Sequence, residues 1–224
     1  NSSAQAVFLR VRDSRAALAA AAHNFYQRPS SMLSVVGITG TNGKTTTSYL
    51  VKSILETWGK KVGLIGTIQY MVGSETYPAP HTTPEAPEFQ MLLRKMLDAG
   101  CSHVVTEVSS HALAQKRVDA TAFSAAVFTN LTRDHLDYHH TMEEYFSSKE
   151  RLFTELLADG AAAAVNRDDP YGRRLAARLK RPVTTFGLEP GAALTATGIR
   201  TSFSGLSFTI TANGQRLGVL SRLV

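Results

Sequence analysis

Cysteine is nearly absent from this sequence, since Cys101 is the only one among 224 residues. One cysteine cannot form an intramolecular disulfide or a cysteine-based zinc site, which excludes a disulfide-stabilised secreted domain. No apolar run approaches the ~18 residues that a membrane-spanning helix needs. The N-terminus also lacks a basic segment followed by an apolar stretch. We therefore expect a cytoplasmic protein with no membrane partner.

Charge of one sign is not concentrated anywhere in the chain. The sequence has 24 Lys and Arg against 18 Asp and Glu, a net charge of +6, while 43% of its residues are hydrophobic. That composition is enough to bury a core and excludes a disordered chain and a coiled coil. The densest basic group, at 173–181, falls on a predicted helix, where a solvated face accounts for it. We expect no nucleic-acid partner, and the positive excess suits polyanionic small molecules.

The spacing of apolar residues predicts strands that alternate with helices. This alternation is typical of an α/β fold with a mostly parallel sheet flanked by helices. Predicted buried strands lie at 33–38, 62–65, 103–109, 124–131, 161–166 and 183–186. Predicted helices lie at 14–25, 45–58, 84–99, 141–157 and 170–179, the second with Tyr49, Leu50, Ile54 and Trp58 on one face.

The two ends of the chain differ from this pattern. Three strand-like runs follow residue 193, and Asn213-Gly214 between the last two is a strong hairpin signal, so a small antiparallel β-sheet is expected near the C-terminus. Residues 27–31 are predicted to form a Pro/Ser-containing linker after the first helix. Because the chain begins at Asn1 and ends within a strand-like run, we interpret it as a fragment of a longer protein.

A glycine-bearing turn lies between the first predicted strand and the helix that follows it. Its GKTT sequence matches the end of the phosphate-loop pattern, but Ile38 stands where that pattern has its first glycine. In such a loop Lys44 would reach the β- and γ-phosphates, and the Thr45 hydroxyl would ligate Mg²⁺. The alternative is a turn that only joins strand to helix. The predicted nucleotide-binding residues are Gly40, Thr41, Asn42, Gly43, Lys44, Thr45 and Thr46.

Two further segments place polar side chains at the carboxyl ends of predicted strands, where ligands bind in open α/β sheets. Glu107 is well placed to ligate Mg²⁺, with helix capping as the alternative. The segment 134–137, Asp-His-Leu-Asp, follows another strand. Spacing alone favours a structural role for His135, with a metal ligand or a general base as alternatives.

Hydroxyl, amide and guanidinium groups are predicted at the same edge of the sheet. They suit a sugar-nucleotide or carboxylate substrate, although solvated loop residues are an equally good interpretation of the sequence alone. These candidates are Thr82, Thr83, Ser109, Gln115 and Arg117.

Lys149 falls inside the apolar stripe of the helix at 141–157. It lies three or four residues from Tyr145, Phe146, Leu152 and Phe153. A lysine that points at the core is costly unless it pairs or loses its charge. Snorkelling along the helix to water is the alternative.

Four ordered motifs together resemble the Mur ligase family, and within it the type that adds the third amino acid to the peptidoglycan precursor. They are GTNGKTT at 40–46, HTTPE at 81–85, EVSSHAL at 107–113 and TNLTRDHLD at 129–137, and the YFSSK segment at 145–149 also matches. The resemblance covers roughly residues 32–224. It implies that this part is most of the family's central ATP-binding domain. Residues 1–31 would be the tail of the uridine-binding domain and a linker, with the C-terminal amino-acid-binding domain absent.

The resemblance also implies chemistry. It predicts an ATP-dependent ligase that joins UDP-N-acetylmuramoyl-L-alanyl-D-glutamate to meso-diaminopimelate or L-lysine through an acyl phosphate. Lys44, His135 and Lys149 would be catalytic, with Lys149 carbamylated by CO₂. Of two Mg²⁺ ions, one would use Thr45 and Glu107 and the other His135 and Lys149. The implied substrate-binding residues are His81, Thr82, Thr83, Ser109, Gln115 and Arg117.

Two other functions stay open. A folylpolyglutamate synthetase is similar in its loop and chemistry, but the segments at 81–84 and 107–113 argue against it. A phosphate-loop module that regulates a partner is the alternative from another class. The fragment alone is expected to be inactive, because aligning both reactants supplies much of the rate.

Overall fold

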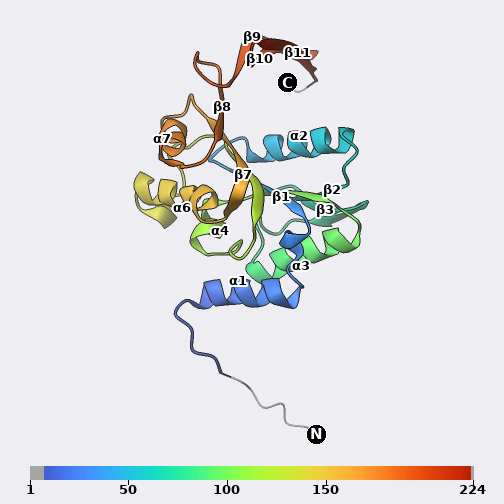
Figure 1. Ribbon diagram of the computed structural model, residues 1–224, viewed down its shortest axis with the longest axis vertical. Helices are drawn as coiled ribbons and strands as arrows, with labels where there is room; N and C mark the ends of the chain where they lie inside the picture. Colours follow the sequence, from blue (N-terminus) through green and yellow to red (C-terminus); the bar gives the residue numbers. More distant parts are fainter. Residues whose placement is uncertain (1–7, 223–224) are drawn as a thin grey trace.

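The computed structural model describes residues 8–222. Its strands form one sheet of eleven, with helices on either side (Figure 1). Across the sheet the strand order is β11-β10-β9-β8-β7-β6-β1-β5-β2-β3-β4. The strands are β1 (Ser34–Thr39), β2 (Val62–Ile65), β3 (Gln69–Val72), β4 (Glu75–Pro78), β5 (His103–Glu107), β6 (Phe123–Phe128), β7 (Leu157–Asn166), β8 (Val183–Gly187), β9 (Leu194–Ser202), β10 (Gly205–Ala212) and β11 (Gln215–Ser221).

The helices connect these strands. They are α1 (Ser14–Phe25), α2 (Lys44–Thr57), α3 (Ala86–Asp98), α4 (Ser110–Ala114), α5 (Leu136–His139), α6 (Met142–Thr154) and α7 (Pro170–Arg178), with a short 3-10 helix, η1 (Pro29–Ser31). The six strands from β8 to β2 in the sheet order are all parallel. The predicted α/β class and mostly parallel sheet are therefore confirmed.

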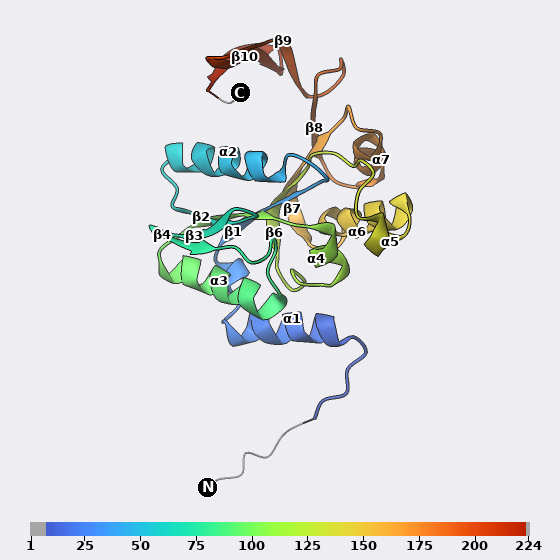
Figure 2. The same ribbon diagram turned by 180° about the vertical axis from the view of Figure 1, so that it is seen from behind.

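Helices cover both faces of the central strands. Figure 2 shows α2 on one side and α3 on the other, with α1 beyond α3. The alternation of side chains along β1 explains the two layers, because Val36 and Ile38 pack toward α2 while Val35 joins the larger core on the opposite face. Ala19 of α1 is fully buried, so α1 packs closely against the rest of the fold.

The apolar residues predicted to share one face of α2 separate in the structure. Tyr49 packs against the sheet together with Val51 and Leu55. By contrast, Leu50, Ile54 and Trp58 are 46%, 67% and 70% exposed. α2 is a one-sided surface helix, and only the stripe that faces β1, β2 and β5 is covered. The predicted end of the helix is confirmed, since Trp58 is the C-cap and Gly59 follows with φ +78°.

Hairpins extend the sheet at both edges. The predicted C-terminal antiparallel strands are present as β9, β10 and β11, with Asn213-Gly214 at the second turn. They continue the main sheet, because β9 pairs parallel with β8. At the other edge, β3 and β4 form a hairpin that the strand patterns did not predict, and its turn at Gly73-Ser74 is of a type that favours hairpins. No helix among residues 8–222 is long and apolar enough to cross a membrane.

Candidate active site

The phosphate loop occupies the turn between β1 and α2, and its backbone needs glycine at two positions. Gly40 has φ +148°, and a Cβ at this residue would overlap Thr129 Oγ1. Gly43 has φ +83° and is the N-cap of α2. Ile38 is fully buried in β1, which continues to Thr39. The strand therefore runs into the motif, and the loop begins at Gly40 rather than at the position that the usual pattern assigns to its first glycine.

The segment after β6 braces this loop from one side. Asn130 accepts the Thr41 N–H through its backbone oxygen and the Asn42 N–H through Oδ1, both at 2.9 Å. Thr129 Oγ1 donates to the Asn42 backbone oxygen at 2.7 Å. These contacts hold the loop open over the N-terminus of α2, where its remaining N–H groups can meet an anion.

Lys44 folds back over the loop. Its Nζ donates to the backbone oxygens of Gly40 at 3.0 Å and Thr41 at 2.9 Å. Burial lowers the pKa of Lys44, while the nearby carboxylates of Glu107 and Asp134 act in the opposite direction. The amine thus points back into the loop between β1 and α2, and both of its hydrogen-bond partners are backbone oxygens.

Glu107 lies at the end of β5 and is completely buried. Oε2 accepts hydrogen bonds from the Thr45 hydroxyl at 2.9 Å and the Thr67 hydroxyl at 3.0 Å, and Oε1 accepts the Thr67 N–H at 3.0 Å. The helix that follows is capped by Ser109, whose Oγ accepts the Ala112 N–H. The capping alternative for Glu107 is therefore excluded, and its carboxylate faces the start of α2.

The segment before α3 brings the predicted substrate-binding residues beside Glu107. Thr83 Oγ1 donates to the Glu107 backbone oxygen at 2.8 Å and accepts the Ser109 N–H at 3.1 Å. Arg117 donates to the Thr83 backbone oxygen at 3.0 Å and forms an ion pair with Glu85 at 3.0 Å. It also donates to Gln115 Oε1. His81 is exposed, and its backbone oxygen accepts the Tyr70 hydroxyl at 2.6 Å.

His135 approaches the same cavity from the opposite side. It has φ +53° at the start of α5, its side chain is 45% exposed, and its Nε2 lies 3.5 Å from Asp134 Oδ2. The ring centroid of His111 lies 4.9 Å away. Burial lowers the pKa of His111, and His135 adds to that effect. The half-exposed ring also meets the buried ring of Tyr145, with the two centroids 6.0 Å apart.

Lys149 is 1% exposed on α6, as its position in the apolar stripe predicts. Its Nζ donates to the Gly40 backbone oxygen at 2.9 Å and lies 4.7 Å from the centroid of the Tyr145 ring. Burial lowers the pKa of Lys149 well below its ordinary value, and Lys44 lowers it further. The snorkelling alternative is excluded, because the amine ends at the phosphate loop instead of in water.

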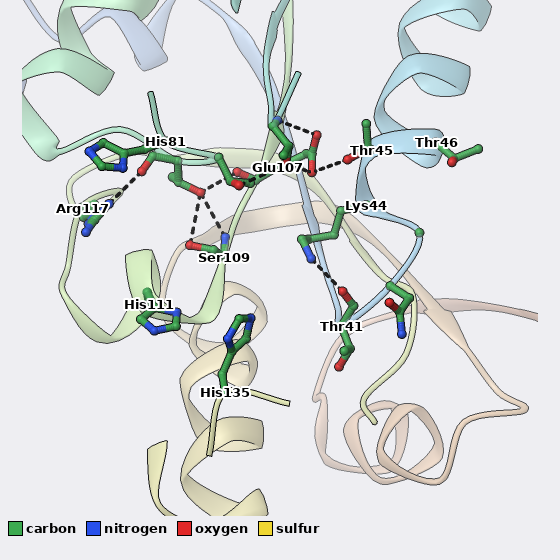
Figure 3. A pocket seen from close by; sticks show the side chains of 15 residues that line it. Thr41, Lys44, Thr45, Thr46, His81, Glu107, Ser109, His111, Arg117 and His135 are labelled. Atoms are coloured by element: carbon green, nitrogen blue, oxygen red, sulfur yellow. Dashed lines mark hydrogen bonds between the residues drawn. The ribbon is translucent and has the colours of Figure 1, made fainter. Parts of the chain in front are cut away.

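A cavity of about 550 Å³ is lined by most of these groups (Figure 3). Of the predicted site residues, only Gly40, Gln115 and Lys149 do not line it. The lining contains two residues that the sequence analysis did not single out, Thr67 and His111. His111 lay within the EVSSHAL motif, which was a usable signal, whereas Thr67 belongs to none of the motifs.

The donor atoms around Glu107 fit magnesium. Within residues 8–222, no group of three or more His, Cys, Asp and Glu side chains could hold a metal by itself. Mg²⁺ is commonly bound by one or two carboxylates together with substrate phosphates and waters. Glu107 and Thr45 offer one carboxylate and one hydroxyl beside the phosphate loop. His135 with the unmodified amine of Lys149 does not form such a set, because Mg²⁺ prefers oxygen donors.

Comparisons with known proteins identify relatives of this chain. The Mur ligase middle domain matches residues 38–224. UDP-N-acetylmuramoyl-L-alanyl-D-glutamate–2,6-diaminopimelate ligases from Geobacter metallireducens and Geobacter sulfurreducens are 52% and 53% identical over 208 residues. Each alignment covers 91% of this chain and 41% of the relative. The chain thus spans about two fifths of the length of these curated relatives.

Solved structures agree with this similarity. A ligase of the same name superimposes with a TM-score of 0.85 at 27% identity, covering 99% of this chain and 46% of the other. A folylpolyglutamate synthase from Mycobacterium tuberculosis has a TM-score of 0.67 at 16% identity, covering 87% of this chain and 51% of the other, which is a similarity of fold. The family match extends over most of the sequence, and the chain belongs to the Mur ligase family.

Proposed function

We propose that the protein containing this chain is an ATP-dependent carbon–nitrogen ligase of peptidoglycan precursor synthesis. It joins UDP-N-acetylmuramoyl-L-alanyl-D-glutamate to a diamino acid, meso-diaminopimelate or L-lysine. The names of the relatives make diaminopimelate the first amine to test. The central observation is the shared cavity, in which a phosphate loop and the polar segment at 81–83 lie on opposite sides of Glu107.

The phosphate loop supplies the first part of the mechanism. Backbone N–H groups of the loop and the start of α2 bind the phosphates, and Lys44 transfers its hydrogen bonds from Gly40 and Thr41 to phosphate oxygens. The side-chain carboxylate of the substrate's D-glutamate attacks the γ-phosphorus, releasing ADP and forming an acyl phosphate. The amine then attacks the acyl carbon, and phosphate leaves from the tetrahedral intermediate. Lys44 neutralises the charge that develops during phosphoryl transfer.

Magnesium would be held by Thr45 and Glu107, with a second ion near His135 and modified Lys149. When bound, Mg²⁺ neutralises the phosphate oxygens and so favours attack by an anion. The buried Glu107 carboxylate supports the first site. Its hydrogen bonds all come from neutral donors, so none of these partners cancels the negative charge that would attract a cation.

Lys149 is proposed to carry a carbamate in the intact enzyme. Its lowered pKa favours the neutral amine, whose lone pair attacks the carbon of CO₂, so that the nitrogen loses one proton and a carbamate anion forms. The product has oxygen donors, which an amine lacks. Lys149→Ala should abolish ligation, with partial recovery in formate, whereas Lys95→Ala on α3 should leave it intact. Full activity of Lys149→Ala in bicarbonate-free buffer would contradict this role.

The groups around the segment at 81–83 are proposed to bind the UDP-muramoyl-dipeptide. His81, Thr82, Thr83 and Ser109 offer backbone and side-chain donors, and Arg117 offers a guanidinium for a carboxylate or phosphate. Gln115 does not line the cavity, and its contact with Arg117 supports a positioning role. Residues 32–224 would be the central ATP-binding domain, residues 1–31 the end of a uridine-binding domain with its linker, and the compartment the cytoplasm.

The test is a binding and product assay with a protein that extends this chain to the length of its relatives. We expect magnesium-dependent binding of UDP-N-acetylmuramoyl-L-alanyl-D-glutamate and, with ATP and a diamino acid, formation of the tripeptide product. Binding of a folate instead would favour the folylpolyglutamate synthetase function, which the similarity of fold allows. Binding of a partner protein or oligonucleotide, without ligation, would favour a regulatory module.

A further inference from the structure

Thr67 makes two of the three hydrogen bonds that hold the Glu107 carboxylate. Its N–H donates to Oε1 and its hydroxyl to Oε2, both at 3.0 Å. The third bond, from the Thr45 hydroxyl, comes from the residue proposed to share the metal with Glu107. Thr67 is therefore the side chain that fixes the rotation of this carboxylate independently of the phosphate loop.

Close approach of the backbone makes this contact possible. Gly66 precedes Thr67 at the end of β2, and a Cβ on Gly66 would lie 2.5 Å from Glu107 Oε1. Without that Cβ, the chain passes beside the carboxylate and presents the next N–H to it. Thr67 itself is exposed and lines the cavity, so it is not a core residue that the fold needs for packing.

The Thr67 hydroxyl also contacts the segment proposed to bind the substrate. Its Oγ1 lies 3.0 Å from Thr82 Oγ1 as well as from Glu107 Oε2. A hydroxyl has one proton to donate, and an ionised carboxylate can only accept. The proton of Thr67 therefore points to Glu107, and Thr82 donates to Thr67. The result is a directed chain of hydrogen bonds from Thr82 through Thr67 to Glu107.

We propose that Thr67 is a positioning residue that orients Glu107 for magnesium and couples this carboxylate to the substrate segment through Thr82. The inference rests on the proposed function, since it needs Glu107 to ligate the metal. Groups that hold a metal ligand in place typically change metal affinity by about 10- to 100-fold when removed. Thr82 lies one hydrogen bond further from Glu107 than Thr67 does. Substituting Thr82 should therefore change the metal affinity by less.

The test measures metal binding, not turnover. Mn²⁺, as a spectroscopic substitute for Mg²⁺, is titrated into the 224-residue chain with a non-hydrolysable ATP analogue, and bound ion is followed by electron paramagnetic resonance. Thr67→Val removes the hydroxyl and keeps the N–H, and it should weaken Mn²⁺ binding about tenfold. Thr67→Ser keeps the hydroxyl and should stay within about twofold of wild type. Thr57→Val, on the exposed end of α2, is the matched control.

A double variant tests the coupling. Thr82→Val should weaken Mn²⁺ binding by less than Thr67→Val, and the double variant should be no weaker than Thr67→Val alone, because the chain of hydrogen bonds is already broken. Thermal melts verify that each variant folds, and Thr67→Ala serves if Thr67→Val does not.

The outcomes separate this inference from the proposed function. If the wild-type chain binds the ATP analogue and Mn²⁺ but Thr67→Val binds Mn²⁺ equally well, the role of Thr67 is wrong and the proposed function stands. The role is also wrong if Thr67→Ser is as weak as Thr67→Val. If the wild-type chain shows no metal-dependent binding of the nucleotide, both proposals fail.

Discussion

Gly40→Ala should destabilise the protein by roughly 2–5 kcal/mol, with two separable causes. The first is the backbone, because φ +148° is a conformation that residues with a Cβ avoid at a cost of about 1–3 kcal/mol. The second is steric, because the new methyl group overlaps Thr129 Oγ1. Moving this hydroxyl breaks its 2.7 Å hydrogen bond to the Asn42 backbone oxygen, a loss of about 1–2 kcal/mol in a buried position.

Gly43→Ala is the matched control within the same loop. Its φ of +83° is also unfavourable for alanine, but a Cβ there meets no atom within 4 Å. Only the backbone cost applies, about 1–2 kcal/mol for a left-handed conformation. The comparison therefore shows how much Gly40→Ala costs beyond an ordinary left-handed backbone.

A double-mutant cycle measures the clash directly, using urea unfolding of the 224-residue chain. Thr129→Ala removes both the hydroxyl that clashes and the bond that the clash would break. Gly40→Ala combined with Thr129→Ala should therefore be less destabilising than the sum of the two single changes by about 1–2 kcal/mol. Additivity within about 0.3 kcal/mol would refute the reasoning, and so would a Gly43→Ala variant as unstable as Gly40→Ala.

Three further changes test other parts of the structure. Lys44→Ala should abolish turnover in the extended enzyme and leave the melting temperature nearly unchanged; near-normal turnover would contradict the phosphate-loop assignment. Arg151→Ala should cost about 2 kcal/mol in urea unfolding, because it leaves the 15% exposed Asp119 unpaired, and Arg151→Lys should recover part of this. The hydrogen bond from Lys116 lowers the pKa of Asp13 to about 2. The stabilisation of the fold by this pair is therefore present above about pH 4 and is lost as the pH falls toward 2. Asp13→Asn should flatten the pH dependence of stability in that window, and an unchanged slope would show that the pair does not stabilise the fold.

Short-range patterns in the sequence were enough for the features that depend on neighbouring residues. The position of the phosphate loop followed from glycines beside a lysine and a threonine between a predicted strand and a predicted helix, and the structure puts Gly40 and Gly43 of this turn at positive φ. The place of Lys149 in the apolar stripe followed from helical periodicity, because residues three and four apart share a helix face. That its amine is buried at Gly40 and does not snorkel to water was decided by the structure. The roles of these residues in binding and catalysis stay predictions.

The short strands and helices of the structure left only a weak pattern in the sequence. The hairpin of β3 and β4 has a Gly-Ser turn, but its strands are four residues each, too short for alternation to stand out. The helices α4 and α5 have five and four residues, less than the two turns that a 3.6-residue period needs to be visible.

Only the tertiary structure decided which distant residues meet. β5 lies between β1 and β2 in the sheet although it follows both in the chain, and this order brings Glu107 between Thr45 and Thr67. The exposure of Trp58 is decided in the same way, since a helix's apolar residues are covered only where the sheet lies. Periodicity in the sequence specifies which residues share one face of a helix or strand. Which other element packs against that face is decided by the pairing of strands that are distant in sequence.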